Sequence, residues 1–140
     1  MSGDELAEWV KRELLANEGD ELNSNKERVK QFIRLTPDGN VIVNNKQLTS
    51  RLQIVLYFIG LAYAKAAGLR EDDTASNKEI ADRLGFPVGT VHPKIKELRE
   101  DHSLIVVGEG IHRINYARIG NLLDEAKRHP SEAGMTRNSV

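Results

Sequence analysis

One stretch of the chain, residues 54–64, consists only of apolar and small side chains and constrains the fold more than any other. A membrane-spanning helix needs about 20 apolar residues, so this run is too short to cross a bilayer. The pattern around it predicts a helix that Thr49 or Ser50 caps and that ends at Gly68. Because apolar residues lie on most of its sides, this helix must be buried on more than one side. Either a hairpin and the terminal helices of the same chain cover it, or a second subunit does.

Composition places the chain among ordinary globular proteins. Its 140 residues suit one domain, and Lys+Arg 20 against Asp+Glu 21 leave a formal net charge of -1. This balance excludes a polybasic protein that coats nucleic acid by bulk charge, and it excludes an acidic disordered tail. Without cysteine the sequence has no disulfides, thiol catalysis or cysteine-ligated zinc. Residues 1–8 are acidic and lack the pattern of a signal peptide, so we expect a soluble cytoplasmic protein.

Charge is unevenly distributed along the chain. Residues 1–25 carry 2 basic and 7 acidic side chains, residues 26–70 carry 8 and 2, and residues 71–140 carry 10 and 12. The middle part is therefore strongly basic although the whole chain is nearly neutral. Any interaction with nucleic acid must depend on where these charges lie in the folded protein.

An amphipathic helix is predicted in the acidic part, residues 1–25. Its apolar side chains follow the i, i+3, i+4, i+8 spacing of one helical face: Leu6, Trp9, Val10 and Leu14. Asn17, Gly19 and Asp20 are expected to end the helix, and we interpret the polar stretch to Asn25 as a linker. The helix either packs on its own domain or uses residues 1–20 to bind a protein partner.

A β-hairpin is predicted within the basic segment, residues 26–48. Two short apolar runs, residues 32–35 and 41–43, are separated by a polar stretch with the turn-forming pair Asp38-Gly39. This pair suits the positive backbone angles of a tight hairpin turn, and the preceding proline presets the bend. We expect two antiparallel strands here.

Two short helices joined by a tight turn are predicted from Ser76 onward. Ser76 and Glu79 have the pattern of a capping box, in which each side chain bonds the amide of the other residue, and Gly85 ends the first helix. Residues 86–89 form the turn. The second helix is expected to span residues 90–101, with an inward face at i, i+4 and i+7: Val91, Ile95 and Leu98. This is the helix-turn-helix arrangement.

A second hairpin is predicted next, with residues 104–107 and 111–114 as β-rich runs around the glycines of residues 108–110. The order helix, helix, hairpin resembles the winged helix-turn-helix family. The resemblance is carried by Asn77-Lys78-Glu79-Ile80-Ala81-Asp82-Arg83-Leu84-Gly85, Gly89-Thr90-Val91 and Ile95-Lys96-Glu97-Leu98-Arg99. With the preceding long helix it covers residues 49–115. Small prokaryotic and archaeal regulators of the MarR and PadR types look similar. The predicted fold class is α+β, mostly helical, a winged helix-turn-helix with an N-terminal helix and a β-hairpin extension.

The family resemblance implies sequence-specific binding of double-stranded DNA in transcription regulation. The helix at about residues 90–99 would lie in the major groove, and the wing at residues 104–114 would lie along the backbone or the minor groove. The implied DNA-binding residues are Thr90, His92, Lys94, Lys96, Arg99, His112 and Arg113, with backbone contacts from Lys78, Lys46 and Arg51. The alternative for Lys94 and Lys96 is that they form only the solvated face of an amphipathic helix.

Two residues depart from the family pattern. Pro93 removes an amide within the recognition helix, which is tolerable if the helix begins at Thr90, because Pro93 then falls in the first turn. Glu109 at the wing tip repels phosphate. Residues 74–118 hold 7 basic and 6 acidic side chains, so this part alone is expected to bind DNA weakly.

The basic residues of the middle segment distinguish two functions. If they share a face with the recognition helix, they supply the positive charge that it lacks. If they lie on the opposite side, the domain can serve instead as a winged-helix adaptor that binds protein in assembly or DNA segregation, with little DNA affinity. The residues concerned are Lys26, Arg28, Lys30, Arg34, Lys46 and Arg51.

A C-terminal helix is expected over residues 116–129, followed by a disordered tail at residues 130–140. Its apolar face is formed by Tyr116, Ile119, Leu122, Leu123 and Ala126, and the spacing 116, 119, 123, 126 approximates a coiled-coil seam. This face either packs on its own domain or contacts the long helix of a second copy. A homodimer would place two recognition helices about one turn of DNA apart, ~34 Å.

The sequence predicts a protein that is not an enzyme. His92, His102 and His112 recur at regular intervals, but the spacing matches no common zinc motif. The chain has neither a phosphate-binding glycine loop of the P-loop type nor a Ser/His/Asp ordering. We therefore expect no cofactor and no metal.

Overall fold

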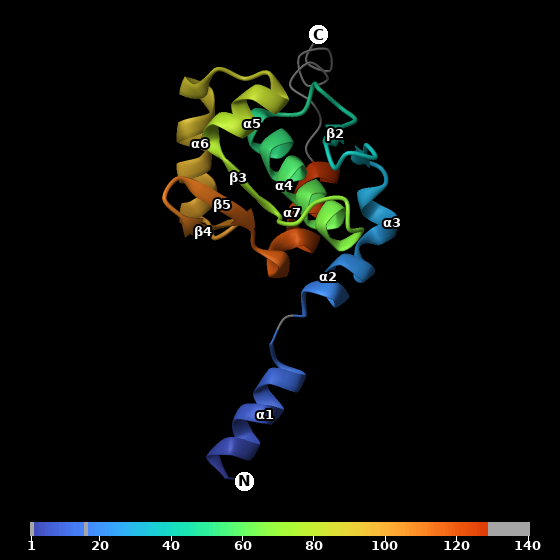
Figure 1. Cartoon of the computed structure of the whole chain (residues 1–140), viewed down its shortest axis with the longest axis vertical. Coiled ribbons are helices and arrows are strands. Elements are labelled where there is room, and N and C mark those ends of the chain that lie inside the picture. The colour runs from blue at the N-terminus through green and yellow to red at the C-terminus, as the bar shows by residue number, and fades with distance from the viewer. Residues whose placement is uncertain (1, 16, 129–140) are drawn as a thin grey trace.

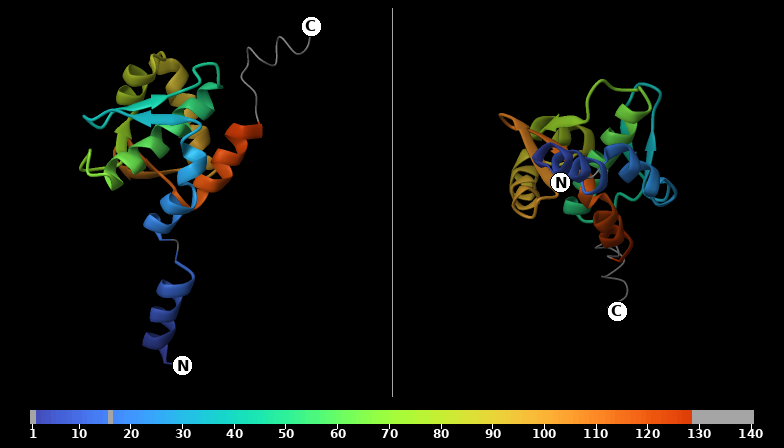
Figure 2. Two further views of the ribbon diagram at one scale, coloured as in Figure 1. Left: turned by 90° about the vertical axis from the view of Figure 1, so that its right-hand side faces the viewer. Right: turned by 90° about the horizontal axis from the view of Figure 1, so that it is seen from below.

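The computed structural model describes residues 2–15 and 17–128 and places one long helix, α4, at the centre of the body (Figure 1). A β-hairpin lies on one side of α4, and a helix-turn-helix with a three-stranded sheet lies on the other (Figure 2). The elements in chain order are α1 (Gly3–Glu13), α2 (Glu18–Ser24), α3 (Lys26–Val29), β1 (Ile33–Leu35), β2 (Val41–Val43), α4 (Ser50–Ala66), β3 (Thr74–Ser76), α5 (Asn77–Leu84), α6 (Val88–Glu100), β4 (Leu104–Gly108), β5 (Ile111–Ile114), the 3-10 helix η1 (Tyr116–Arg118) and α7 (Ile119–Arg128).

Helix α4 forms as its sequence predicts. The Thr49 hydroxyl accepts a hydrogen bond from the Leu52 amide at 3.3 Å, and the helix ends shortly before Gly68. Every residue from 52 to 62 is buried, as a helix with apolar residues on most sides requires. The hairpin, the helix-turn-helix, the sheet and α7 pack around it, so the cover comes from the same chain. Within residues 2–15 and 17–128 no helix is long and apolar enough to cross a membrane.

Strands β1 and β2 form the predicted antiparallel hairpin, with Ile33 opposite Val43. Gly39 in the turn has a φ of +85°, a backbone conformation that favours glycine. Val41 on β2 lies directly against α4 at Gly60. A Cβ atom added to Gly60 would lie 2.3 Å from the Val41 Cγ1 atom, so the absence of a side chain at Gly60 allows the hairpin to approach the helix.

Residues 74–114 form the winged helix-turn-helix arrangement that the sequence predicts, within an α+β fold. Helices α5 and α6 are joined by a short turn, and β4 and β5 form the wing hairpin. A third strand, β3, pairs with β5 and completes a sheet of order β3-β5-β4. Strand β3 is missing from the sequence prediction because its three residues are too few to show an alternating pattern.

Helix α5 begins with half of the predicted capping box. The Ser76 hydroxyl accepts a hydrogen bond from the Glu79 amide at 3.2 Å. The Glu79 carboxylate accepts instead from the Tyr57 hydroxyl on α4, at 3.0 Å. Burial raises the pKa of Tyr57, and the charge of Glu79 raises it further. The predicted bond from the Ser76 amide back to the Glu79 carboxylate is therefore wrong, because Tyr57, a residue distant in the sequence, donates to this carboxylate instead.

Helix α6 begins two residues earlier than predicted, at Val88. The residue before it, Pro87, is extended with a ψ of 146°, so the helix begins directly after it. Pro93 is consequently the sixth residue of the helix and lies beyond its first turn. A proline there cannot donate to the carbonyl four residues back, which belongs to Gly89. The prediction that Pro93 falls in the first turn is therefore wrong, and the helix continues through it.

The described part of residues 1–25 contains two helices, α1 and α2, where one helix and a linker are predicted. Asn17, expected to end the first helix, caps the second: its side-chain oxygen accepts from the Asp20 amide at 3.0 Å. Leu22 on α2 is buried, and its carbonyl accepts from the Tyr63 hydroxyl on α4 at 2.6 Å. The linker prediction is wrong because the residue types that interrupt one helix also start another. Helix α1 forms as predicted, has no buried residue and stands clear of the body (Figure 1).

The apolar face of α7 is buried within the same chain. Its buried residues are Ile119, Leu122, Leu123 and Ala126, and Tyr116 is buried in η1 just before it. Helix α7 packs against α4 and α2, which is the own-domain alternative for this face. The structure describes one chain, so the homodimer stays a prediction. His129 and the predicted disordered tail, residues 130–140, lie outside the described residues.

Substitution of Gly60 by alanine tests the close approach of α4 and β2. We expect Gly60→Ala to lower the free energy of unfolding by about 2 kcal/mol, because the new methyl group collides with Val41. Shortening Val41 makes room, so Gly60→Ala combined with Val41→Ala should lose less stability than the two single substitutions added together. Urea denaturation followed by circular dichroism measures all three variants. Strictly additive losses would contradict the contact.

Candidate nucleic-acid interface

Helix α6 is anchored to the body by one face and exposes the remainder. Val91, Ile95 and Leu98 are buried in the core, as their spacing predicts. The other side chains fall on two flanks of the helix. The flank beside the wing carries His92, Lys96 and Arg99, and the flank beside the start of α4 carries Thr90, Lys94 and Glu97. The first flank is the one that borders a groove.

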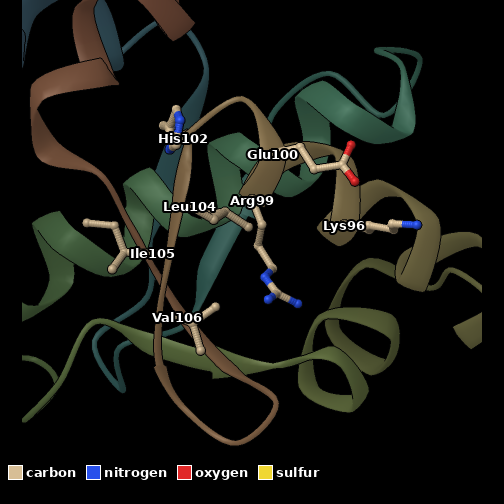
Figure 3. A pocket seen from close by; sticks show the side chains of 7 residues that line it. All are labelled: Lys96, Arg99, Glu100, His102, Leu104, Ile105 and Val106. Atoms are coloured by element: carbon tan, nitrogen blue, oxygen red, sulfur yellow. The ribbon is translucent and has the colours of Figure 1, made fainter.

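Two adjoining hollows, of about 530 and 640 Å³, form this groove between α6 and the wing, and we call it the wing groove. Lys96, Arg99 and Val106 line both hollows, and Figure 3 shows the first from close by. Lys96 and Arg99 are exposed, and neither forms an ion pair with another residue in the described parts of the chain. Cations in such a position can donate to phosphate oxygens or to acceptor atoms on base edges.

His92 is held in the wing groove by α5. The Asn77 amide nitrogen lies 3.1 Å from the Nδ1 atom of His92, and both residues line the groove. When this amide donates to Nδ1, the proton of the neutral ring is on Nε2, which is then a hydrogen-bond donor. The sequence analysis assigned no role to Asn77. Its place as the first residue of α5, beside the recognition helix, could have indicated it.

His112 forms the floor of the wing groove. It is 3% exposed and lies on the inner face of β5, opposite Val106 of β4. Burial lowers the pKa of His112, and the positive charge of Arg99 lowers it further. The ring is therefore neutral at pH 7. Because the side chain is buried, it is not accessible to a ligand at the protein surface. The structure gives no support to the predicted DNA contact of His112.

Arg113 lies on the opposite face of β5 and is occupied by acidic partners. Its guanidinium lies 2.7 Å from Glu18 and 3.1 Å from Asp73, and it stacks over the Tyr116 ring at 5.1 Å. The Tyr116 hydroxyl also donates to Asp73 at 2.7 Å. These contacts join α2, the sheet and η1. Arg113 therefore has a role in the fold, and the structure does not support the predicted DNA contact.

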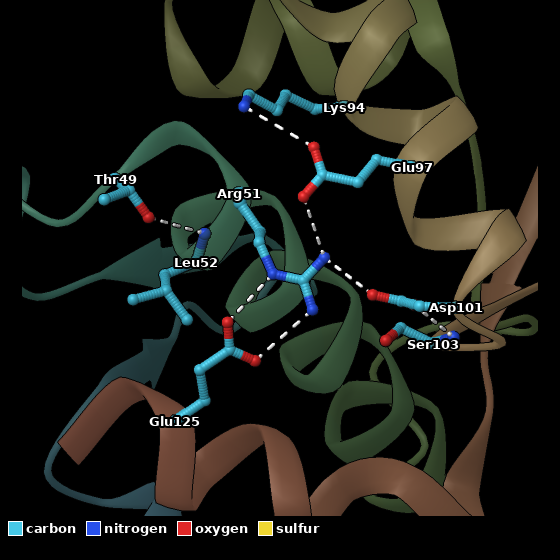
Figure 4. Close-up of polar contacts among 8 residues, drawn as sticks. All are labelled: Thr49, Arg51, Leu52, Lys94, Glu97, Asp101, Ser103 and Glu125. Atoms are coloured by element: carbon cyan, nitrogen blue, oxygen red, sulfur yellow. Dashed lines mark hydrogen bonds and ion pairs between the residues drawn. The ribbon is translucent and has the colours of Figure 1, made fainter. Parts of the chain in front are cut away.

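Arg51 joins three helices, as Figure 4 shows. Its side chain is 17% exposed and faces three carboxylates at 3.3, 2.8 and 2.9 Å, those of Glu97, Asp101 and Glu125. Burial alone would lower the pKa of Arg51, but the hydrogen bonds and charges of Glu125 and Asp101 outweigh it and raise the pKa. Lys94 extends this network, 3.6 Å from Glu97. Arg51 is thus engaged inside the body, where the sequence predicted a backbone contact.

Four other basic residues of segment 26–51, in α3, directly after it and in β1, lie away from α6: Lys26, Arg28, Lys30 and Arg34. Figures 1 and 2 show α3 and the β1–β2 hairpin on the side of α4 opposite to α6. Arg28 pairs with Asp124 on α7, Lys30 pairs with Glu27, and Arg34 donates to backbone carbonyls. The basic side chains of α3 and β1 therefore do not share a face with α6, and Arg51, which does lie beside α6, is paired with carboxylates.

The remaining predicted contacts differ in position. Lys78 is exposed on the first turn of α5, next to the groove residue Asn77, and Thr90 is half-buried on α6. Lys46 is exposed in the loop between β2 and α4, which does not line the wing groove. Glu109, at the wing tip, does line it. The structure thus brings His92, Lys96 and Arg99 together, with Lys78 nearby.

A family model described as winged helix-turn-helix DNA-binding matches residues 69–102. The matched part contains β3, α5 and α6. Comparison with curated proteins and with solved structures gives no match. Residues 69–102 are therefore similar to winged helix-turn-helix domains of the DNA-binding type. The narrower resemblance to MarR- or PadR-type regulators stays a prediction.

The regularly spaced histidines all line the wing groove, but they lie on three different elements. His92 is on α6, His102 is exposed in the loop after it, and His112 is buried on β5. Across residues 2–15 and 17–128, no group of three or more His, Asp or Glu side chains is placed to hold a metal ion.

Removal of the Arg51 side chain should destabilise the fold. We expect Arg51→Ala to lower the free energy of unfolding by about 2 kcal/mol, because the carboxylates of Asp101 and Glu125 then lose their shared cation. Lys46→Ala, which removes an exposed basic side chain, is the control and should change stability by less than about 0.5 kcal/mol. Urea unfolding compares them. Equal losses would show that Arg51 does not hold the helices together.

The buried His112 should make the fold sensitive to mildly acidic pH. Its pKa in the folded protein lies below the ordinary value of 6.5, so the unfolded chain takes up a proton first as the pH falls. The contribution of neutral His112 is therefore present above about pH 6.5 and is lost progressively below it. Denaturation at about pH 7, 6 and 5 should show a falling free energy of unfolding. His112→Leu cannot take up a proton and should show a shallower fall; an unchanged slope would contradict this assignment.

Proposed function

We propose that this protein binds double-stranded DNA at specific sequences and acts as a transcription regulator in the cytoplasm. The observation that carries the proposal is the exposed pair Lys96 and Arg99, on the outward flank of the second helix of a winged helix-turn-helix. The description of the matching family as DNA-binding supports it. Helix α6 enters the major groove of DNA in this proposal, and α5 crosses the backbone.

Each residue of the interface has a role that suits its chemistry. Arg99 and Lys96 donate to guanine acceptor atoms or to phosphate oxygens, which are common partners of both side chains. His92 donates from Nε2 beside them. Lys78 on α5 contacts phosphate. Lys94 has a lesser role, because Glu97 already pairs with it.

The wing contributes little positive charge to this interface. Glu109 at its tip repels phosphate, and four of its exposed side chains are apolar: Ile105, Val106, Val107 and Ile111. With the basic side chains of α3 and β1 on the far side of α4 and Arg51 paired with carboxylates, one copy neutralises few phosphates, so it binds weakly and with a small salt dependence. Two copies on a two-fold-related site supply the affinity of a regulator. The homodimer in this proposal uses a surface other than α7, whose apolar face is already buried.

A winged-helix adaptor is the second candidate function. The position of the basic segment favours it, and so do the exposed apolar side chains of α1 and of the wing. In this role the domain binds another protein, in assembly or DNA segregation, and has little affinity for DNA. The two functions predict different responses to the loss of Lys96 and Arg99.

Selection from a randomised duplex library, followed by fluorescence anisotropy, tests the proposal. We expect the recovered duplex to bind more tightly than a scrambled one. Arg99→Ala should weaken binding about tenfold or more, because one lost contact to a base costs about 1–3 kcal/mol. Lys96→Ala should weaken binding and reduce the salt slope of log Kd by about one.

Lys26→Ala and Lys127→Ala are the matched controls, since both remove an exposed lysine outside the interface. They should leave the affinity within about twofold. Absence of binding at about 50 mM salt, or equal losses for the interface and control variants, would contradict DNA binding through α6 and favour the adaptor.

A further inference from the structure

Most of the exposed large apolar side chains in the described residues lie in two places. One is α1 with the two residues after it, and the other is the wing. The first carries Leu6, Trp9, Val10, Leu14 and Leu15, and the second carries Ile105, Val106, Val107 and Ile111. Such groups on a protein surface mark sites of interaction, because leaving apolar area in water is unfavourable. We therefore expect α1 and the wing each to bind another protein surface.

Helix α1 is formed but has no cover. None of its 11 residues is buried. The Ser2 hydroxyl accepts from the Glu5 amide at 3.1 Å, so the helix start is capped. An isolated helix of this length is nevertheless marginal in water, and in proteins such helices are stabilised by packing of the apolar face. A surface that receives α1 is required.

The apolar face of α1 has an acidic border. Glu5, Trp9 and Glu13 follow one another at i, i+4 and i+8 and so lie along one side of the helix. Leu6 and Val10 lie next to this row. The tryptophan thus has a carboxylate one turn before it and one turn after it. A receiving surface that suits α1 is apolar in the middle and basic at the edge.

The wing groove beside β4 has this character. Its apolar lining comes from Leu104, Ile105 and Val106, and its basic lining comes from Lys96 and Arg99, with His102 and the acidic Glu100 beside them (Figure 3). Glu109, at the wing tip, is a second acidic member. Strand β4 is also one of the two edge strands of the sheet. Proteins commonly cover such an edge with a helix or a loop, because it otherwise invites aggregation.

We infer that α1 of one copy docks in the wing groove of a second copy. Trp9 enters the hollow between α6 and β4, and Glu5 and Glu13 face Lys96 and Arg99. The second copy returns its own α1 to the first, so a two-fold axis relates the two contacts and the assembly closes as a homodimer. Helix-in-groove binding of this kind is a common mode of recognition.

The position of α1 indicates that the groove in which it docks belongs to a second copy of the chain. Figures 1 and 2 show α1 extending away from its own body. Helix α2, which follows it, is tied to the sheet by the 2.7 Å ion pair between Glu18 and Arg113. Helix α1 is therefore presented outward from a defined point on the body, where another molecule can receive it.

Docking of α1 covers Lys96 and Arg99, so it competes with DNA for the same cations. This consequence rests on the proposed function, but the homodimer does not. In the proposal the exchanged homodimer is the DNA-free form, distinct from the DNA-bound pair of copies described above, and duplex DNA displaces α1 from the groove.

Sedimentation velocity and the fluorescence of Trp9, the one tryptophan of the sequence, test the homodimer without DNA. We expect a concentration-dependent dimer and a blue shift of the emission with the same concentration dependence. Trp9→Ala should raise the dimer dissociation constant about tenfold or more, as loss of an aromatic anchor does. The body should stay folded, because no residue of α1 is buried. Ile42→Ala removes an exposed apolar side chain on β2 and should leave the dimer unchanged.

A charge exchange identifies the two surfaces. Lys96→Glu with Arg99→Glu makes the groove acidic, and Glu5→Lys with Glu13→Lys makes the row on α1 basic. Each doubly substituted protein should be monomeric alone, whereas an equimolar mixture should dimerise, because both contacts then join opposite charges.

Matched controls carry the same charge changes elsewhere. Asp4→Lys with Glu8→Lys alters the other side of α1, and Lys26→Glu with Lys127→Glu alters α3 and α7. Both controls should dimerise like the unmodified chain.

Three outcomes would overturn the inference. They are a chain that is monomeric at all concentrations with an exposed Trp9, a blue shift that is independent of concentration, and a dimer that Trp9→Ala does not weaken. The second would show docking in the chain's own groove, and the third would show another interface such as pairing of β4 edges. If the mixture dimerises but no duplex binds or releases Trp9, the proposed function fails and the homodimer stands.

Discussion

The burial of α4 on all sides is the constraint on which the rest of the structure depends. A helix whose residues 52–62 are all buried has no face for solvent, so the remaining elements must be wrapped around it. The hairpin approaches closely because Gly60 has no side chain opposite Val41. Helix α6 is anchored in the same core by Val91 and Ile95. The orientation of the recognition helix is thus set by the packing on α4.

The same packing determines which charges remain for a ligand. Arg51, at the start of α4, faces carboxylates from α6 and α7, and Arg113 faces Glu18 and Asp73. These arginines hold the fold together and are not available to DNA. Lys96 and Arg99 have no such partners among the described residues, because they lie on the flank of α6 that the core leaves free. The charge of a sequence segment is therefore a poor guide to the charge of the surface that it forms.

Local sequence patterns correctly predicted the elements that depend only on residues close together in the chain. The spacing of Val91, Ile95 and Leu98 predicted the buried face of α6, and the turn at Gly39 predicted the first hairpin. One error arose where a distant residue competes, and two arose where a local signal allows more than one interpretation. The Glu79 carboxylate turns to Tyr57 and leaves the capping box half formed. The start of α6 was misplaced because Pro87 acts as its cap, and α2 was missed because a polar run can both end and begin a helix.

The sequence by itself determined the order of elements, the need to bury the central helix and the helix-turn-helix pattern, because these depend on residues close together in the chain. Only the tertiary structure decided which basic side chains are free. It placed α3 and the β1–β2 hairpin on the far side of α4, buried His112 on the inner face of the wing strand β5 and left α1 without cover. Spacing along a helix or strand fixes the side of the element on which a residue lies. What that side meets depends on how distant elements pack, and no local pattern contains that information.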